Sequence, residues 1–102
     1  MFPPVADSQE AIRRLCREFR VRRLELFGSA TGDEFDSESS DLDFIVEFDH
    51  AGPSGYADAY FGLLDGLRAL FDREIDLVVL SAIENPYFLE SIERSRTSLY
   101  AA

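Results

Sequence analysis

Aspartates and a Gly-Ser pair give this chain the residue types needed to hold a metal ion and a phosphate. Asp41 and Asp43 stand two positions apart at the start of a segment with a strand pattern, 42–48. Residues two apart in a strand point to the same face, roughly 6.6 Å apart, and paired carboxylates suit a hard cation such as Mg²⁺. Gly28 and Ser29 end an earlier strand pattern. A glycine there lets the backbone approach a phosphate, and the next turn offers N–H and hydroxyl donors.

A third aspartate, Asp76, interrupts an apolar segment, 74–80, that also has a strand pattern. Three carboxylates on adjacent strands could hold two metal ions. The simpler interpretation is that these aspartates are turn residues or solvent-facing strand positions. Because Asp is a poor strand former, its repeated use within apolar segments favours metal ligation.

The run from Leu26 to Phe48 resembles the motif of the minimal nucleotidyltransferases of the polymerase-beta superfamily, in which a Gly-Ser pair is followed, after a polar spacer, by Asp-x-Asp. The segment 74–78 is similar to the family's third-carboxylate strand. Residues 85–87 and 99–102 are similar to parts of its C-terminal helix. The resemblance covers the chain from about residue 13 to residue 102.

This resemblance implies roles for the residues named above. Asp41, Asp43 and Asp76 would bind two Mg²⁺ ions, with Asp76 also acting as general base on the acceptor hydroxyl. Gly28 and Ser29 would cradle the β,γ-phosphates of ATP. The implied fold is the nucleotidyltransferase fold, a small mixed β-sheet with helices packed on it.

The resemblance also implies a partner, because minimal nucleotidyltransferases commonly serve as antitoxins of HEPN-domain toxins. Characterised members transfer AMP from ATP to a Tyr hydroxyl of the toxin. Larger enzymes of the superfamily carry a further domain for the acceptor, for which 102 residues leave no room. We therefore expect the acceptor on another chain, and a hetero-oligomer with a HEPN protein.

Two other functions stay open, the first of them because of a departure from the family pattern. Family members often carry a basic residue and then Gly three and four positions after the Ser, where this chain has Gly32 and Asp33. An inactive antitoxin that neutralises its partner by contact is one alternative. Transfer to a small molecule such as an aminoglycoside, with a homodimer or second subunit completing the pocket, is another. Six arginines within residues 13–23 could supply the missing cation, although a solvated helix face that balances the acidic remainder is the better explanation for them.

Composition limits the function classes further. The net charge is −10, and all ten basic residues are Arg. Nucleic-acid binding depends on cationic neutralisation of phosphates, so DNA or RNA is not expected as the principal ligand. The apolar fraction of 46% suits a single packed domain over 1–102, and no apolar stretch is long enough for a membrane span. The lone Cys16 excludes an internal disulfide and fits a reducing compartment, predicting a cytoplasmic protein.

The hydrophobic pattern predicts an α/β arrangement of helices on a sheet. Strands are expected at 21–27, 42–48 and 74–80, and helices at about 8–19, 56–72 and 86–98. Alternation places Leu42, Phe44, Val46 and Phe48 on one face of the second strand and the aspartates on the other. Arg13, Arg17 and Arg20 follow helical spacing and would form one exposed stripe.

Overall fold

The computed structural model describes residues 3–28, 42–49, 55–79, 85–93 and 96–101. None of the helices in these ranges is long and apolar enough to cross a lipid bilayer. The helices are α1 (Pro3–Asp7), α2 (Gln9–Glu18), α3 (Tyr56–Phe71) and α4 (Pro86–Glu93), and the strands are β1 (Val21–Phe27), β2 (Leu42–Phe48), β3 (Ile75–Val79) and β4 (Thr97–Ala101).

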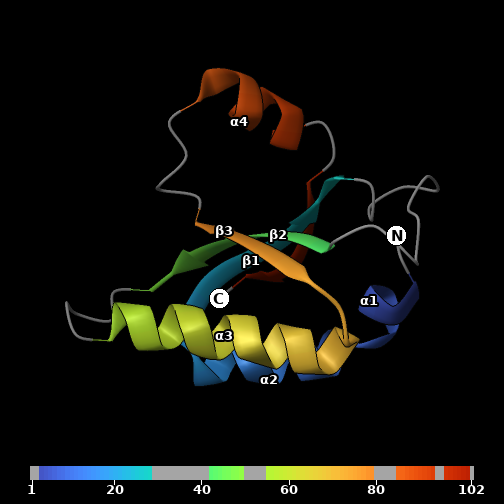
Figure 1. The fold of residues 1–102 in the computed structure, drawn as a ribbon, viewed down its shortest axis with the longest axis vertical. Helices are drawn as coiled ribbons and strands as arrows, with labels where there is room; N and C mark the ends of the chain where they lie inside the picture. The colour runs from blue at the N-terminus through green and yellow to red at the C-terminus, as the bar shows by residue number, and fades with distance from the viewer. Residues whose placement is uncertain (1–2, 29–41, 50–54, 80–84, 94–95, 102) are drawn as a thin grey trace.

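The strands form a mixed sheet in the order β3-β2-β1-β4. β1 is antiparallel to both of its neighbours, β2 and β4, whereas β2 and β3 are parallel. The expectation of a small mixed sheet with helices packed on it is confirmed (Figure 1).

The connections of the parallel strands place α3 and α4 on opposite faces of the sheet. α3 leads from β2 to its neighbour β3, whereas α4 leads back from β3 past β2 and β1 to β4. β4 runs in the same direction as β3, so both connections are crossovers between parallel strands, and such crossovers are right-handed. Two right-handed crossovers that move in opposite directions along a sheet must use opposite faces. Figure 1 shows this arrangement, with α2 and α3 below the sheet and α4 above it.

The main core lies between the sheet and the pair α2 and α3. Each fully buried aliphatic or aromatic side chain there contributes about 1.5–3 kcal/mol through removal of apolar surface from water. The predicted apolar face of β2 is confirmed, with Phe48 partly buried at its end. The buried residues of this core from β2, α2 and α3 are Leu42, Phe44, Val46, Ile12, Cys16, Leu63, Leu64 and Leu67.

The close approach of α2 and α3 depends on two glycines in α3, Gly62 and Gly66. A Cβ atom built on Gly62 would collide with the ring of Phe19 at the end of α2. One turn later, a Cβ on Gly66 would lie 2.5 Å from a terminal methyl of Leu15. Leu15 and Phe19 therefore pack directly onto the backbone of α3, which brings the two helix axes closer than larger residues would allow.

The last predicted helix begins where expected but ends early. Pro86 suits the first turn of a helix because it lacks an N–H, and Asn85 Oδ1 accepts a hydrogen bond from the Tyr87 N–H at 2.9 Å. The prediction that this helix continues to Ser98 and includes 99–102 is wrong, because α4 ends at Glu93 and residues 97–101 form β4.

The physical reason for this error is a non-local pairing. β4 runs along the second edge of β1, where Leu24 pairs with Tyr100 and Leu26 with Thr97. A strand in this position satisfies backbone groups that an open edge of β1 would leave exposed. The short helix α1 was also absent from the sequence-based prediction, and it adds the fully buried Val5 to the core.

Candidate active site

Two of the three predicted carboxylates lie side by side on neighbouring strands. Asp43 of β2 and Asp76 of β3 are partners in the parallel register. Adjacent strands are about 4.8 Å apart, and side chains at paired positions of parallel strands point to the same face. Asp43 is half-buried and Asp76 is exposed. The sheet therefore presents a pair of carboxylates, which we call the carboxylate row, on the face opposite the main core.

Gly28 meets this row from the end of β1. Its backbone is left-handed, with φ of +78°, and an added Cβ would lie 2.8 Å from Oδ2 of Asp43. Any side chain at this position would thus be strained and would displace the carboxylate. The preceding residue, Phe27, pairs with Asp43 across the sheet. Gly28, the glycine that the sequence predicted to approach a phosphate, therefore packs closely against the carboxylate of Asp43.

The other predicted site residues, Asp41 and Ser29, lie outside the described residues. Between 3 and 101, the described ranges hold no cluster of three His, Cys, Asp or Glu side chains placed to bind a metal. The pair that is described fits a divalent cation by its chemistry, since hard cations prefer carboxylate oxygens. Within the described chain, no Arg forms an ion pair with Asp76.

The surface beside the carboxylate row is a small apolar cluster, which we call the apolar floor. Phe27 and Ile45 are buried and pack with Val78 in a small cluster separate from the main core. Ile45 and Val78 each follow an aspartate of the row by two residues, so they share its face. Charges above such a floor interact more strongly than they would in bulk water, which suits a site for a metal–triphosphate.

Comparison with known proteins decides the family. The family model of the nucleotidyltransferase domain matches residues 8–99. The chain belongs to the nucleotidyltransferase family. The resemblance inferred from the Gly-Ser and Asp-x-Asp residues is thereby confirmed.

Two relatives of this nucleotidyltransferase come from Methanocaldococcus jannaschii, and each is named "Putative protein adenylyltransferase". One is 35% identical over 94 residues and the other 38% identical over 93 residues, and each comparison covers 87% of this chain and 91% of the relative.

Solved structures share its fold. A structure described as a "putative minimal nucleotidyltransferase" has a TM-score of 0.69 at 25% identity, over 94% of this chain and 93% of that chain. A chain from the complex of tri-AMPylated Shewanella oneidensis HEPN toxin with its MNT antitoxin has a TM-score of 0.64 at 19% identity, over 96% of this chain and 73% of that chain.

Sequence reasoning missed one partly buried ion pair of this nucleotidyltransferase. Nε of Arg96 donates to one carboxylate oxygen of Glu25 at 2.5 Å and Nη2 to the other at 2.6 Å. The hydrogen bonds from Arg96 lower the pKa of Glu25, although burial opposes the shift. The two residues are 71 positions apart, so no local pattern links them. The only available signal was a Glu inside the apolar strand 21–27.

The arginines near the N-terminus of the nucleotidyltransferase do not form the predicted stripe. Arg13 and Arg17 are exposed on α2, and Arg13 pairs with Glu10 at 3.6 Å, as expected of a solvated helix face. Arg20 is not on that helix, because its backbone is left-handed with φ of 57° after the helix has ended. Arg22 on β1 pairs instead with Glu47 at 3.6 Å.

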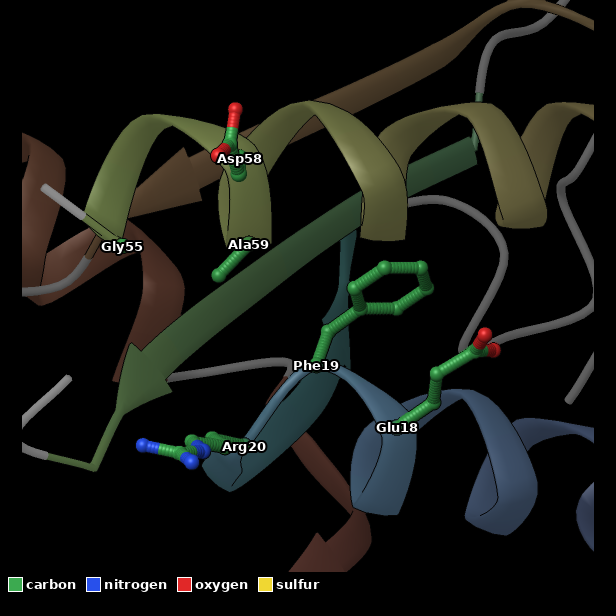
Figure 2. Close-up of a pocket in the computed structure, with 6 residues that line it drawn as sticks. All are labelled: Glu18, Phe19, Arg20, Gly55, Asp58 and Ala59. Carbon is green, nitrogen blue, oxygen red and sulfur yellow. The ribbon is translucent and has the colours of Figure 1, made fainter.

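A pocket of about 340 Å³ lies elsewhere, between the end of α2 and the start of α3. Figure 2 shows the ring of Phe19 and the methyl of Ala59 in this pocket, with the charged ends of Glu18, Arg20 and Asp58 spread apart around it. Both apolar side chains belong to the helix side of the sheet. The pocket is thus on the opposite face from the carboxylate row and contributes nothing to it.

Proposed function

We propose that this nucleotidyltransferase transfers AMP from ATP to a hydroxyl, that of a Tyr, on a HEPN-domain toxin and so acts as its antitoxin. The observation that carries the proposal is the carboxylate row, with Asp43 and Asp76 in register on one face and Gly28 backed onto Asp43. The names of the two Methanocaldococcus relatives support the reaction. The neighbouring complex of an MNT antitoxin with an AMPylated HEPN toxin supports the partner.

Asp43 and Asp76, together with Asp41, would hold divalent cations of the Mg²⁺ type. When bound, such cations neutralise charge on a triphosphate and make an acceptor hydroxyl more acidic. Gly28 and Ser29 would receive the β,γ-phosphates at the end of β1, since the absence of a Cβ leaves the backbone accessible.

The transfer itself would be an in-line displacement at the α-phosphorus of ATP. The acceptor oxygen forms a bond to that phosphorus, and the bond to the bridging oxygen of the β-phosphate breaks. AMP stays on the acceptor and pyrophosphate leaves. Asp76, the exposed member of the row, would take the proton from the hydroxyl, since it is the carboxylate most open to an approaching protein.

Gly32 and Asp33, in place of the family's basic residue and Gly, favour a second candidate function. Without that cation the triphosphate loses one charge-assisted contact. The chain would then neutralise a HEPN toxin by binding it, with no nucleotide transfer.

One experiment separates the two functions. Purified protein would be incubated with Mg²⁺ and α-labelled ATP, with and without a HEPN-domain protein as candidate partner. Wild type would be compared with Asp43→Asn and Asp76→Asn, and with Asp65→Asn as a matched control from the exposed side of α3.

Label on the partner with wild type and Asp65→Asn, but not with the other two variants, is the expected result. A stable complex that never acquires label would contradict AMP transfer and favour neutralisation by contact.

A further inference from the structure

Three charged side chains meet where β1, β4 and α4 join, and we call them the Arg96 cluster: Glu25, Arg96 and Glu93. Arg96 holds Glu25 through two hydrogen bonds of 2.5 and 2.6 Å and reaches Glu93 through NH1 at 3.2 Å. Glu25 is 5% exposed and is the one charged residue that is buried within the described part of the chain. The cluster links the residue before β4 to β1 and to the exposed last residue of α4.

The Arg96 cluster lies at the Gly28 side of the carboxylate row. Thr97, the first residue of β4, pairs with Leu26. Arg96 comes just before it and is therefore level with Phe27, which pairs with Asp43 on the other side of β1. At about 4.8 Å for each strand step, the start of β4 is about 10 Å from Asp43 and farther from Asp76. The cluster is therefore nearer to the proposed phosphate site than to the proposed proton acceptor.

The carboxylate of Glu25 points to the same face as the row. Glu25 and Phe27 are two apart on β1, and Phe27 packs in the apolar cluster beneath the row. Without Arg96, Glu25 would place a negative charge within about 10 Å of Asp43, over an apolar floor that screens it poorly. The guanidinium of Arg96 cancels most of this charge, because the second cation near Glu25, Arg23, is more exposed and lies farther away at 3.9 Å.

α4 needs such an attachment. Within the described chain it packs less against the sheet than α2 and α3 do, so apolar burial does little to fix it. Glu93 is its last residue and is held by Arg96. A cation near this end also interacts favourably with the negative end of the helix dipole.

We propose that Arg96 is a positioning residue for the nucleotide site, acting in two ways. It shields the phosphates of ATP from Glu25, and it anchors the C-terminal end of α4 over the carboxylate face. This inference rests on the nucleotide site of the proposed function. It explains why Glu25 is buried here with Arg96 beside it, although buried ion pairs add little net stability over apolar residues of similar size.

Binding of Mg²⁺-ATP, measured by calorimetry, tests the shielding. Arg96→Gln leaves Glu25 with Arg23 alone, an exposed partner at 3.9 Å, and is expected to weaken ATP binding about tenfold. The double variant Glu25→Gln/Arg96→Gln removes both charges and is expected to recover most of the affinity. Arg14→Gln, which removes an equally charged but exposed side chain, should bind as wild type does. Circular dichroism would establish the folded fraction of each variant. Folded Arg96→Gln that binds ATP as tightly as wild type would overturn the shielding.

Hydrogen–deuterium exchange without nucleotide tests the anchor. Amides of α4 should exchange faster in both the single and the double variant, while those of β1 and β2 keep their protection. Unchanged exchange in α4 would overturn the anchor.

These readouts separate the inference from the proposed function. Wild type that binds ATP in a manner dependent on Arg96, but transfers no AMP, would contradict the reaction and leave the inference standing. Wild type that binds no ATP would overturn both the nucleotide site and the shielding, and α4 exchange would still decide the anchor.

Discussion

The two faces of the sheet are built from the same strands, yet they differ in what they require of their residues. On β2, Leu42, Phe44 and Val46 turn toward α2 and α3 and are fully buried, whereas Asp43 and Glu47 turn to the other face and are half-buried. The helix face stabilises the fold through apolar burial. In the proposed function, the carboxylate face carries the groups that react. Alternation along a strand thus lets neighbouring residues serve stability and chemistry separately.

The largest effect should come from the carboxylate face and should appear in activity alone. Asp43→Asn or Asp76→Asn is expected to lower AMP transfer at least about 100-fold, because metal and proton contacts supply several kcal/mol of transition-state stabilisation. Initial rates with α-labelled ATP would measure the loss. If the urea midpoint of either variant fell as much as that of a core variant, the carboxylate face would also contribute to stability, and the two faces would not have separate roles.

The matching change on the helix face is Leu63→Ala. Leu63 is fully buried in the main core, so the free energy of unfolding should fall by about 2–5 kcal/mol. Urea denaturation followed by circular dichroism would measure it. The folded fraction should transfer AMP at the wild-type rate, and a lower rate per folded molecule would show that the helix face also takes part in catalysis.

The buried ion pair between Glu25 and Arg96 should make stability depend on pH. Hydrogen bonds from Arg96 lower the pKa of Glu25 below its ordinary value of 4.5, so its stabilising contribution is present above pH 4.5 and is lost as pH falls through the lowered pKa. Wild type should exceed Glu25→Gln by about 1.5–3 kcal/mol at pH 7. Urea titrations at a series of pH values would show the difference shrinking in acid, and a constant difference would contradict the ion pair.

Gly62→Ala tests the contact between α2 and α3. Alanine usually stabilises a helix by up to about 1 kcal/mol relative to glycine. Here the new Cβ would collide with the ring of Phe19, so a net loss of about 1–3 kcal/mol is expected from overpacking. Thermal denaturation would compare this variant with Ala69→Gly, at an exposed position of the same helix. Alanine should give the more stable protein at position 69, and glycine the more stable protein at position 62. A stabilised Gly62→Ala would mean that the helices are farther apart than described.

The smallest effect concerns Cys16 in the main core. Burial raises the pKa of its thiol to about 12, so the reactive thiolate is nearly absent at pH 8. Labelling by an alkylating reagent should be negligible in native protein and rapid in urea. Rapid labelling of folded protein would contradict the burial of this side of α2.

The sequence predicted those features that repeat locally. The bounds of β1 and β2 follow from alternation and agree with the structure at both ends. The side of β2 that carries Asp43 could be assigned from the same alternation. The family could be recognised because its motif residues are close in sequence.

What could not be predicted depends on pairings between distant segments. β4 is five residues long and forms only because β1 offers it an edge. The Arg96 cluster joins residues from opposite ends of the chain, so neither member signals the other. The approach of Gly28 to Asp43 likewise requires the register of β1 and β2, which periodicity alone does not fix.

In the proposed function, the carboxylate face binds the nucleotide. The most direct test is a titration of ¹⁵N-labelled protein with Mg²⁺-ATP, followed by amide chemical shifts. The predicted result is a set of shifts centred on Gly28, Asp43 and Asp76, with the amides of Phe19 and Ala59 unchanged. Shifts centred instead on the pocket at Phe19 and Ala59, with the carboxylate row unaffected, would contradict the claim and move the nucleotide site to the helix face.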